Sequence, residues 1–195
     1  MSDTVTTVLL CGVGGQGTIL AADLLARVAI AAGVDVKVSE IHGMAQRGGA
    51  VTTVVRFGED VKSMVTDTGR ADCVVSFEKM EALRNISFCK SDGLLLVNDE
   101  VIKPQSVATG KADLPTDMDA QLAEANALVI PAADLAREAG TVKAANVVLL
   151  GALSTRLDFS EAIWKDCIEK RVPAKFLKEN LAAFDSGRAF ATSSN

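Results

Sequence analysis

The sequence predicts an α/β fold, with a three-layer, Rossmann-like sheet that is mostly parallel, contains a hairpin and carries helices on both faces. The first observation is an apolar strand-like segment at residues 5–11, followed by a glycine-rich turn and an uninterrupted helical pattern at residues 18–32. Strand-like and helical segments then keep alternating, which is typical of sheets covered by helices. Aromatic residues make up only 4% of the chain and Tyr is absent. Val, Leu, Ile and Ala must therefore fill the core, which suits buried strands.

The remaining elements follow from the same patterns. Strands are expected at residues 5–11, 34–41, 50–57, 72–77, 94–97 and 127–130. Helices are expected at residues 18–32, 78–89, 116–126, 134–139 and 144–157, and as a pair between 160 and 184 that is split at Val172-Pro173. Residues 61–65 are expected to pair back on the third strand as a hairpin.

The chain as a whole is predicted to be one domain, residues 1–195, with C-terminal helices from about residue 160. Pro104 and Pro115 bracket a stretch with little periodicity, so we expect residues 103–116 to run over the surface. The last five residues are expected to be loose.

Charge and hydropathy exclude several classes of partner. The net charge is -5 and the basic residues form no stripe, so neither nucleic acid nor an anionic membrane is an expected partner. No apolar stretch reaches the roughly 18 residues that a membrane span needs. The N-terminus lacks the basic start of a signal peptide. These features predict a cytoplasmic protein.

The four cysteines are spread along the chain at Cys11, Cys73, Cys89 and Cys167, and no CxxC pair exists. Cys11 and Cys73 lie in apolar segments, where cysteine behaves as a small hydrophobic residue. Iron–sulfur clusters and zinc sites usually need clustered thiolates. We therefore expect this chain to hold no metal or cluster by itself.

The glycine-rich turn places Gly12, Gly14 and Gly17 in a GxGxxG pattern between a strand and a helix. Such a turn lets a backbone approach closely and points helix N–H groups at an anion. Gly15 and Gln16 complete the turn, and the Gln16 amide could hydrogen-bond a ligand or a partner's backbone. The alternative is that the glycines serve only strand–helix packing.

Dinucleotide binding would need an acid at the end of the second strand to meet a ribose hydroxyl. Glu40 is the candidate, although it comes 28 residues after Gly12, later than the usual spacing of about 20 residues. Asp35 comes earlier but sits at the wrong end of that strand. The pattern alone therefore leaves dinucleotide binding open.

A second polar loop follows the second strand and contains His42, the only histidine, with Gln46, Arg47 and Gly48. If the first two strands run parallel, this loop and the glycine loop lie at the same edge of the sheet, where open α/β sheets bind ligands. A glycine-flanked guanidinium such as that of Arg47 can meet a carboxylate or phosphate bidentately. The alternatives are a structural His42 and an Arg47 that pairs with an internal acid.

Two further catalytic patterns are not supported. Asp92-Gly93 followed by Asn98 superficially matches a thiamine diphosphate motif, but the spacing is too short and the segment is predicted to be a turn before a strand. With a single histidine, no Ser–His–Asp or Cys–His arrangement can be argued.

Taken together, these motifs resemble the gamma-type domain of 2-oxoacid:ferredoxin oxidoreductases. The resemblance is carried by five segments that span nearly the whole chain: residues 12–17, 40–49, 71–84, 146–153 and 180–187. The His-Gly-Met-x-Gln-Arg-Gly-Gly form of the second segment is similar to the indolepyruvate branch of that family. Gamma subunits for pyruvate or 2-oxoglutarate more often show a Tyr-Gly-Pro-type sequence before Arg-Gly-Gly, and this chain has no Tyr.

The resemblance implies a small subunit that is inactive alone. It implies that a larger alpha subunit holds thiamine diphosphate, magnesium and iron–sulfur clusters, that coenzyme A takes the acyl group after oxidative decarboxylation of an arylpyruvate, and that ferredoxin accepts the electrons. We hypothesise that Arg47 and the amides of Gly14–Gly17 face an anion, with His42 and Gln46 alongside. Two other functions remain open: a gamma subunit for aliphatic 2-oxoacids, and a free-standing nucleotide-binding module.

Overall fold

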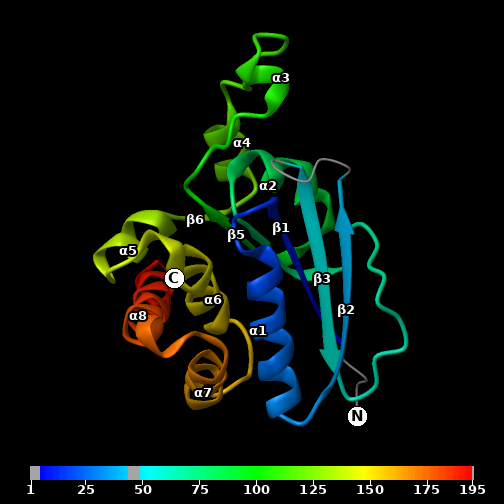
Figure 1. Cartoon of the computed structure of the whole chain (residues 1–195). Helices are drawn as coiled ribbons and strands as arrows, with labels where there is room; N and C mark the ends of the chain where they lie inside the picture. The colour runs from blue at the N-terminus through cyan, green and yellow to red at the C-terminus, as the bar shows by residue number, and fades with distance from the viewer. Residues whose placement is uncertain (1–4, 44–48, 195) are drawn as a thin grey trace.

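The computed structural model describes residues 5–43 and 49–194, which form a six-stranded sheet in the order β2-β3-β1-β4-β5-β6 (Figure 1). In chain order the strands are β1 (Thr6–Val13), β2 (Asp35–His42), β3 (Ala50–Gly58), β4 (Ala71–Ser76), β5 (Cys89–Asn98) and β6 (Leu128–Ile130). Each one overlaps a predicted strand.

The parallel part of the sheet consists of β1, β4, β5 and β6. Along β1, Val8 and Leu10 belong to the core on one face of the sheet, whereas Leu9 and Cys11 belong to the core on the other face. All four are at most 1% exposed. Burial on both faces explains why this strand is apolar throughout instead of alternating with polar residues.

Strand β3 runs antiparallel to both β1 and β2. The predicted hairpin between residues 61–65 and β3 is therefore wrong, and the real hairpin joins β2 to β3. The guanidinium of Arg56 donates hydrogen bonds to the carbonyl oxygens of Ser63 (2.8 Å) and Val65 (2.9 Å), and the Asp35 carboxylate accepts from the N–H of Val61 (3.0 Å). Side chains therefore supply hydrogen-bond partners to backbone groups of residues 61–65, so this segment needs no neighbouring strand.

Helices cover both faces of the sheet, which confirms the three-layer architecture. The helices are α1 (Thr18–Ala31), α2 (Lys79–Asn85), α3 (Gln105–Ala108), α4 (Met118–Glu124), α5 (Ala132–Glu138), α6 (Ala145–Ser154), α7 (Glu161–Arg171) and α8 (Leu177–Ser193). Helices α1 and α5 to α8 share one core, and α2 and α4 share the core on the opposite face (Figure 1).

Helices α6 and α8 cross at two glycines. A Cβ atom added to Gly151 would collide with the Phe184 backbone, and one added to Gly187 would collide with the Val148 backbone. Both glycines belong to segments that carried the family resemblance, and their role here is helix packing. The predicted loose tail is wrong, because α8 continues to Ser193 and buries Ala191.

Residues 103–116 were predicted to run over the surface, but they project away from the body and contain the short helix α3, which lies above α4 (Figure 1). The Lys79 ammonium forms ion pairs with Asp99, which precedes this excursion, and with Asp119, which follows it. Both ends of the excursion are thus fixed to the first turn of α2. Among the described residues, no helix is both long and apolar enough to cross a membrane.

Candidate functional site

The glycine loop lies between β1 and α1 at the carboxyl edge of the parallel strands. Gly15 (φ +104°) and Gly17 (φ +84°) have left-handed backbone conformations, which explains glycine at these two positions. Gly12 was predicted to belong to the turn, but it lies within β1. There it is buried beneath Phe77 and the Gln16 side chain. Its role is close packing, and the turn itself starts after Val13.

Gln16 connects the glycine loop to the neighbouring strands. Its Oε1 accepts a hydrogen bond from the N–H of Val13 (2.9 Å), and its Nε2 donates to the carbonyl oxygen of Phe77 (2.9 Å) and more weakly to the Glu100 carboxylate (3.4 Å). Gln16 therefore holds the loop in shape through contacts inside the chain. From the sequence, the Gln16 amide was a candidate to hydrogen-bond a ligand or a partner's backbone. In the structure it hydrogen-bonds other residues of the same chain instead.

Two other contacts hold the loop. The Nδ2 of Asn146, on α6, lies 3.5 Å from the carbonyl oxygen of Gly17. The same side chain leaves no room for a Cβ atom on Gly17. Asn146 starts another of the segments that carried the family resemblance, so that segment supports the glycine loop directly.

The second loop meets the glycine loop. The N–H of Gly14 donates to the carbonyl oxygen of Gly49 (3.0 Å), and the N–H of Gly43 donates to that of Ala50 (2.8 Å). His42 is the last residue of β2, opposite Val51 on β3. The predicted site residues Gln46, Arg47 and Gly48 lie outside the described residues, but both ends of their segment are at the same sheet edge as the glycine loop.

Some backbone donors of the loop remain available. The amide of Gly14 is used by Gly49, whereas within the described part of the chain the N–H groups of Gly15 and Gly17 have no acceptor. The first N–H groups of α1 also lack partners inside the helix, and the helix dipole adds partial positive charge there. These donors and the dipole favour an anion at this point.

Glu40 lies on the wall of the same groove as Gly14, Gly15 and Gly17. Asp35 is at the other end of β2, where Lys37 and the N–H of Val61 bind its carboxylate. In dinucleotide-binding folds the strand that carries the acid is next to the strand of the glycine loop. Here β3 separates them, which adds a strand spacing of about 4.8 Å and disfavours a shared dinucleotide.

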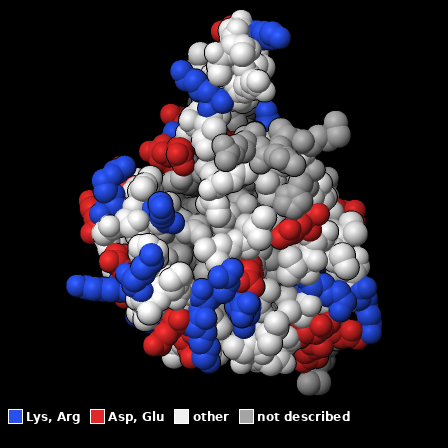
Figure 2. Space-filling model, viewed as in Figure 1, with Lys and Arg blue, Asp and Glu red and all other residues white. Residues whose placement is uncertain are grey.

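The groove that these residues line has a volume of about 840 Å³ and lies between α1 and the exposed face of β2 and β3. The glycine loop lies at the start of α1, and Asp23, Arg27 and Arg171 line the groove further along that helix. Figure 2 shows basic side chains gathered between α7 and the lower half of α1. The groove therefore combines free amides near its beginning with guanidinium groups further along.

Sequence reasoning missed a buried polar network at the same edge of the sheet. The Glu78 carboxylate caps α2 by accepting from the N–H groups of Met80 (3.0 Å) and Glu81, and it also accepts from that of Ile102 (3.5 Å). Burial raises the pKa of Glu78, although these hydrogen bonds act in the opposite direction. An acid followed three residues later by Glu81 is a helix-start pattern that could have revealed this cap.

Asn98 is another buried member of this network. Its Nδ2 donates to the Phe77 carbonyl oxygen (3.2 Å) and to Glu100 (3.1 Å), and its Oδ1 accepts from the N–H of Ala132 (3.1 Å). Asn98 is therefore structural, in agreement with the rejected thiamine motif. The predicted turn at residues 91–93 is wrong, because these residues belong to β5.

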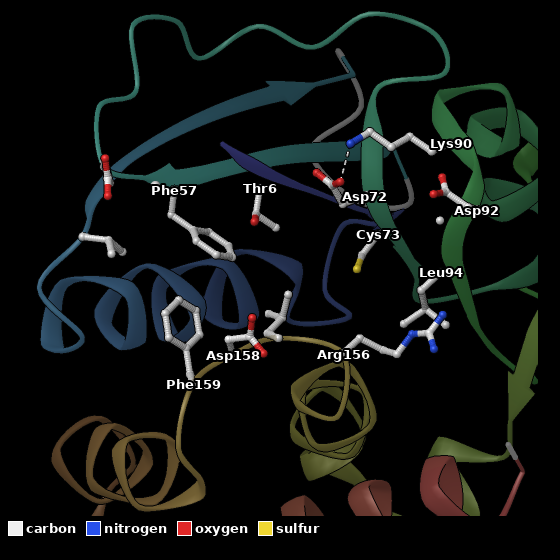
Figure 3. Close-up of a pocket in the computed structure, with 15 residues that line it drawn as sticks. Thr6, Phe57, Asp72, Cys73, Lys90, Asp92, Leu94, Arg156, Asp158 and Phe159 are labelled. Carbon is white, nitrogen blue, oxygen red and sulfur yellow. Dashed lines mark hydrogen bonds and ion pairs between the residues drawn. The ribbon is translucent and has the colours of Figure 1, made fainter. Parts of the chain in front are cut away.

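A second cavity, of about 520 Å³, lies at the opposite edge of the sheet (Figure 3). Asp72 and Lys90 form an ion pair at its rim, and Cys73 points into it near Arg156. Burial raises the pKa of the Cys73 thiol to about 12, so the reactive thiolate is disfavoured. Because α/β sheets bind ligands at their carboxyl edge, the glycine-loop groove is the stronger candidate site.

The thiols do not suit a metal cluster. Burial also raises the pKa of Cys11 to about 12, whereas ligation needs the thiolate. Among the side chains that the structure describes, no group of three or more Cys, His, Asp or Glu is placed to hold a metal ion.

Comparison with known proteins identifies the family. The profile of "Pyruvate ferredoxin/flavodoxin oxidoreductase" matches residues 7–190. The chain is 43% identical to an indolepyruvate oxidoreductase subunit from Thermococcus kodakarensis, over 92% of this chain and 93% of that one. It is 27% identical to a gamma subunit common to pyruvate and ketoisovalerate oxidoreductases from Pyrococcus abyssi, over 92% and 95% of the two chains.

A solved structure shares the fold. A 2-oxoglutarate:ferredoxin oxidoreductase from Magnetococcus marinus, described with 2-oxoglutarate, coenzyme A and succinyl-CoA bound, superposes with a TM-score of 0.76 at 23% identity. The match covers 98% of this chain and 32% of that chain. The profile match and the extended identity show that this chain belongs to the pyruvate ferredoxin/flavodoxin oxidoreductase family.

Proposed function

We propose that this chain is the small subunit of an indolepyruvate:ferredoxin oxidoreductase, which oxidatively decarboxylates an arylpyruvate to an acyl-CoA. The observation that carries the proposal is the 43% identity to an indolepyruvate oxidoreductase subunit, against 27% to the common gamma subunit for pyruvate and ketoisovalerate. Both matches cover more than nine tenths of this chain. The His-Gly-Met start of the second loop supports the same branch.

In this proposal the larger alpha subunit holds thiamine diphosphate, magnesium and the iron–sulfur clusters, and ferredoxin accepts the electrons. The buried thiols Cys11 and Cys73 support this division, because their raised pKa values make them poor cluster ligands. Thiamine diphosphate supplies the carbanion-stabilising chemistry when it is bound to the partner. This chain contributes binding and orientation, and the complex works in the cytoplasm.

The chain's own contribution is an anion-binding surface made by its two loops. The N–H groups of Gly15 and Gly17 and the start of α1 supply donors, and Arg47 supplies a guanidinium, with His42, Gln46 and Gly48 alongside. The hydrogen bond from Gly14 to Gly49 supports this arrangement, because it brings the second loop to the first. The anion is a phosphate of coenzyme A or a carboxylate of the partner.

The substrate is tested with the complete complex. The chain is co-produced with the large subunit of the proposed complex, and turnover is measured with ferredoxin and coenzyme A on indolepyruvate, pyruvate and 2-oxoglutarate. We expect kcat/KM to be highest for indolepyruvate and the isolated small chain to be inactive. A preference for pyruvate or 2-oxoglutarate would assign the chain to the aliphatic branch, and turnover by the chain alone would refute the subunit role.

The anion site is tested with Arg47→Ala in the assembled complex. If the guanidinium meets coenzyme A, the KM for coenzyme A rises at least tenfold while the KM for the 2-oxoacid changes little. The matched control is Arg137→Ala, which removes an exposed arginine of α5 that pairs with Asp134. An unchanged KM for coenzyme A in an intact complex would leave only the role of binding the partner.

A further inference from the structure

The first half of α1 has an apolar hollow on each side. On one side is the groove already described, with Val38 and Val51 on its wall. On the other side, a hollow of about 160 Å³ lies where α1, α6 and α7 meet the chain that leads into α8, and Val172 and Phe176 line it. Leu20 lines both hollows, so they form one continuous surface.

Large apolar side chains project from this surface. Ile19 on α1 is 50% exposed and lines the first groove, and Phe176 is 41% exposed and lines the second hollow. Val142 is 49% exposed next to Lys143, which also lines the second hollow. Exposed apolar side chains that border shared hollows indicate a contact surface rather than isolated surface residues.

The rim of this surface is basic although the chain carries a net charge of -5. Arg27 and Arg171 flank Asp23, at 3.0 Å and 2.5 Å from its carboxylate oxygens. Partial burial acts to raise the pKa of Asp23, but the hydrogen bonds from both guanidinium groups outweigh it and lower that pKa. Lys143 lines the second hollow, and the Lys175 ammonium lies 4.8 Å from the centre of the Phe176 ring.

We infer that this surface binds a segment of the large subunit that presents apolar side chains flanked by Asp and Glu. The inference rests on the proposed function, which supplies the partner. Ile19 and Phe176 project outward, as the central residues of protein interfaces do, whereas small-molecule sites enclose their ligands. Four cations outnumber the two carboxylates of Asp23 and Glu40 around this apolar centre, and the excess of positive charge complements carboxylates on the partner, which guide association and fix its orientation.

The test compares matched variants in the binding of the purified large subunit. Ile19→Ser combined with Phe176→Ser removes both projecting side chains, and we expect the dissociation constant to rise at least tenfold. The control is Ile30→Ser, because Ile30 lies on the same helix and is 62% exposed but lines neither hollow. It should change the dissociation constant less than twofold. Circular dichroism and thermal unfolding establish that each variant is folded.

The basic rim is tested separately. Lys143→Glu combined with Lys175→Glu should slow association and weaken its dependence on salt. Lys62→Glu combined with Lys111→Glu makes the same change of charge at exposed lysines that line neither hollow and should have little effect. Equal association rates for the two pairs would overturn the electrostatic half of the inference.

The outcomes separate this inference from the proposed function. If the wild-type chain binds no large subunit, both fail. If the wild-type chain binds and the Ile19/Phe176 variant binds equally well, only the docking surface is wrong. If the isolated wild-type chain forms a dimer that the double variant abolishes, while binding of the large subunit is unchanged, the surface belongs to a second copy of the chain.

Discussion

The Nε2 atom of Gln16 lies 2.9 Å from the carbonyl oxygen of Phe77, and this hydrogen bond connects the glycine loop to the end of β4. Gln16→Glu replaces the donor with a carboxylate that faces this carbonyl and lies near Glu100. We expect the free energy of unfolding to fall by about 1–3 kcal/mol, because a polar contact becomes repulsive. Urea unfolding measures it, with Gln121→Glu on the exposed face of α4 as the control. Equal losses in both variants would contradict a special role for Gln16.

Where α6 and α8 cross, we expect glycine-to-alanine substitutions to lower stability, which is the opposite of the effect that helix propensity predicts. Gly→Ala inside a helix ordinarily stabilises by about 1 kcal/mol. At Gly151 or Gly187 the added methyl group meets the backbone of the other helix, so we expect each substitution to destabilise by about 3 kcal/mol or more. Thermal unfolding checks this, with Ser186→Ala on α8 as the control. Stabilisation by Gly151→Ala would show that the helices do not cross at these glycines.

Glu78 predicts a pH-dependent contribution to stability. Burial raises the pKa of Glu78 above its ordinary value of 4.5. The folded state therefore holds this proton more tightly than the unfolded state, and the associated stability is present below about pH 4.5 and lost as the pH rises through the folded pKa. Glu78→Gln cannot titrate and avoids this loss. The unfolding free energy of the wild type minus that of the variant should therefore decrease as pH rises.

Urea unfolding between pH 4.5 and pH 8 measures that difference for Glu78→Gln. The control is Glu124→Gln, which makes the same substitution at an exposed position of α4. A difference that grows in favour of the wild type with rising pH would mean that the hydrogen bonds to the carboxylate, and not its burial, dominate.

Substitutions of Trp164 on α7 and of its neighbour Phe184 are expected to lower stability by different amounts. Its indole Nε1 is buried without a hydrogen-bond partner among the described residues, and its ring lies 5.8 Å from that of Phe184. Trp164→Phe removes the unpaired donor along with part of the apolar surface, so we expect a loss of about 1 kcal/mol or less. Phe184→Ala leaves a cavity and should cost about 3–5 kcal/mol. Similar losses for the two variants, by urea unfolding, would contradict this account.

The sequence patterns predicted the three layers and the glycine loop because both depend on local signals. Gly33, with φ +81°, ends α1 where a helix stop was expected, and Pro173 separates α7 from α8. The hairpin was misplaced because residues 61–65 have a strand-like composition, whereas the side chain of Arg56 binds the carbonyl oxygens of Ser63 and Val65. That choice depends on a contact between a side chain and the backbone, which periodicity does not encode.

The candidate site could be predicted only in part for the same reason. The proximity of the two loops followed from the shared direction of β1 and β2, and the contact between Gly14 and Gly49 agrees with it. The internal use of Gln16 could not be foreseen, because its partners Phe77 and Glu100 are more than 60 positions away in the chain. The roles of Gln46, Arg47 and Gly48 stay predictions.

Lys79 anchors both ends of the projecting segment, residues 103–116, and this affects how its length can change. Because one ammonium group binds both Asp99 and Asp119, it holds the two ends of this segment close together whatever the length of the polypeptide between them. Insertions or deletions there alter only how far the protein extends beyond its carboxyl edge. We therefore expect the projection to change in length without unfolding of the body, and to act as a spacer at this end of the molecule.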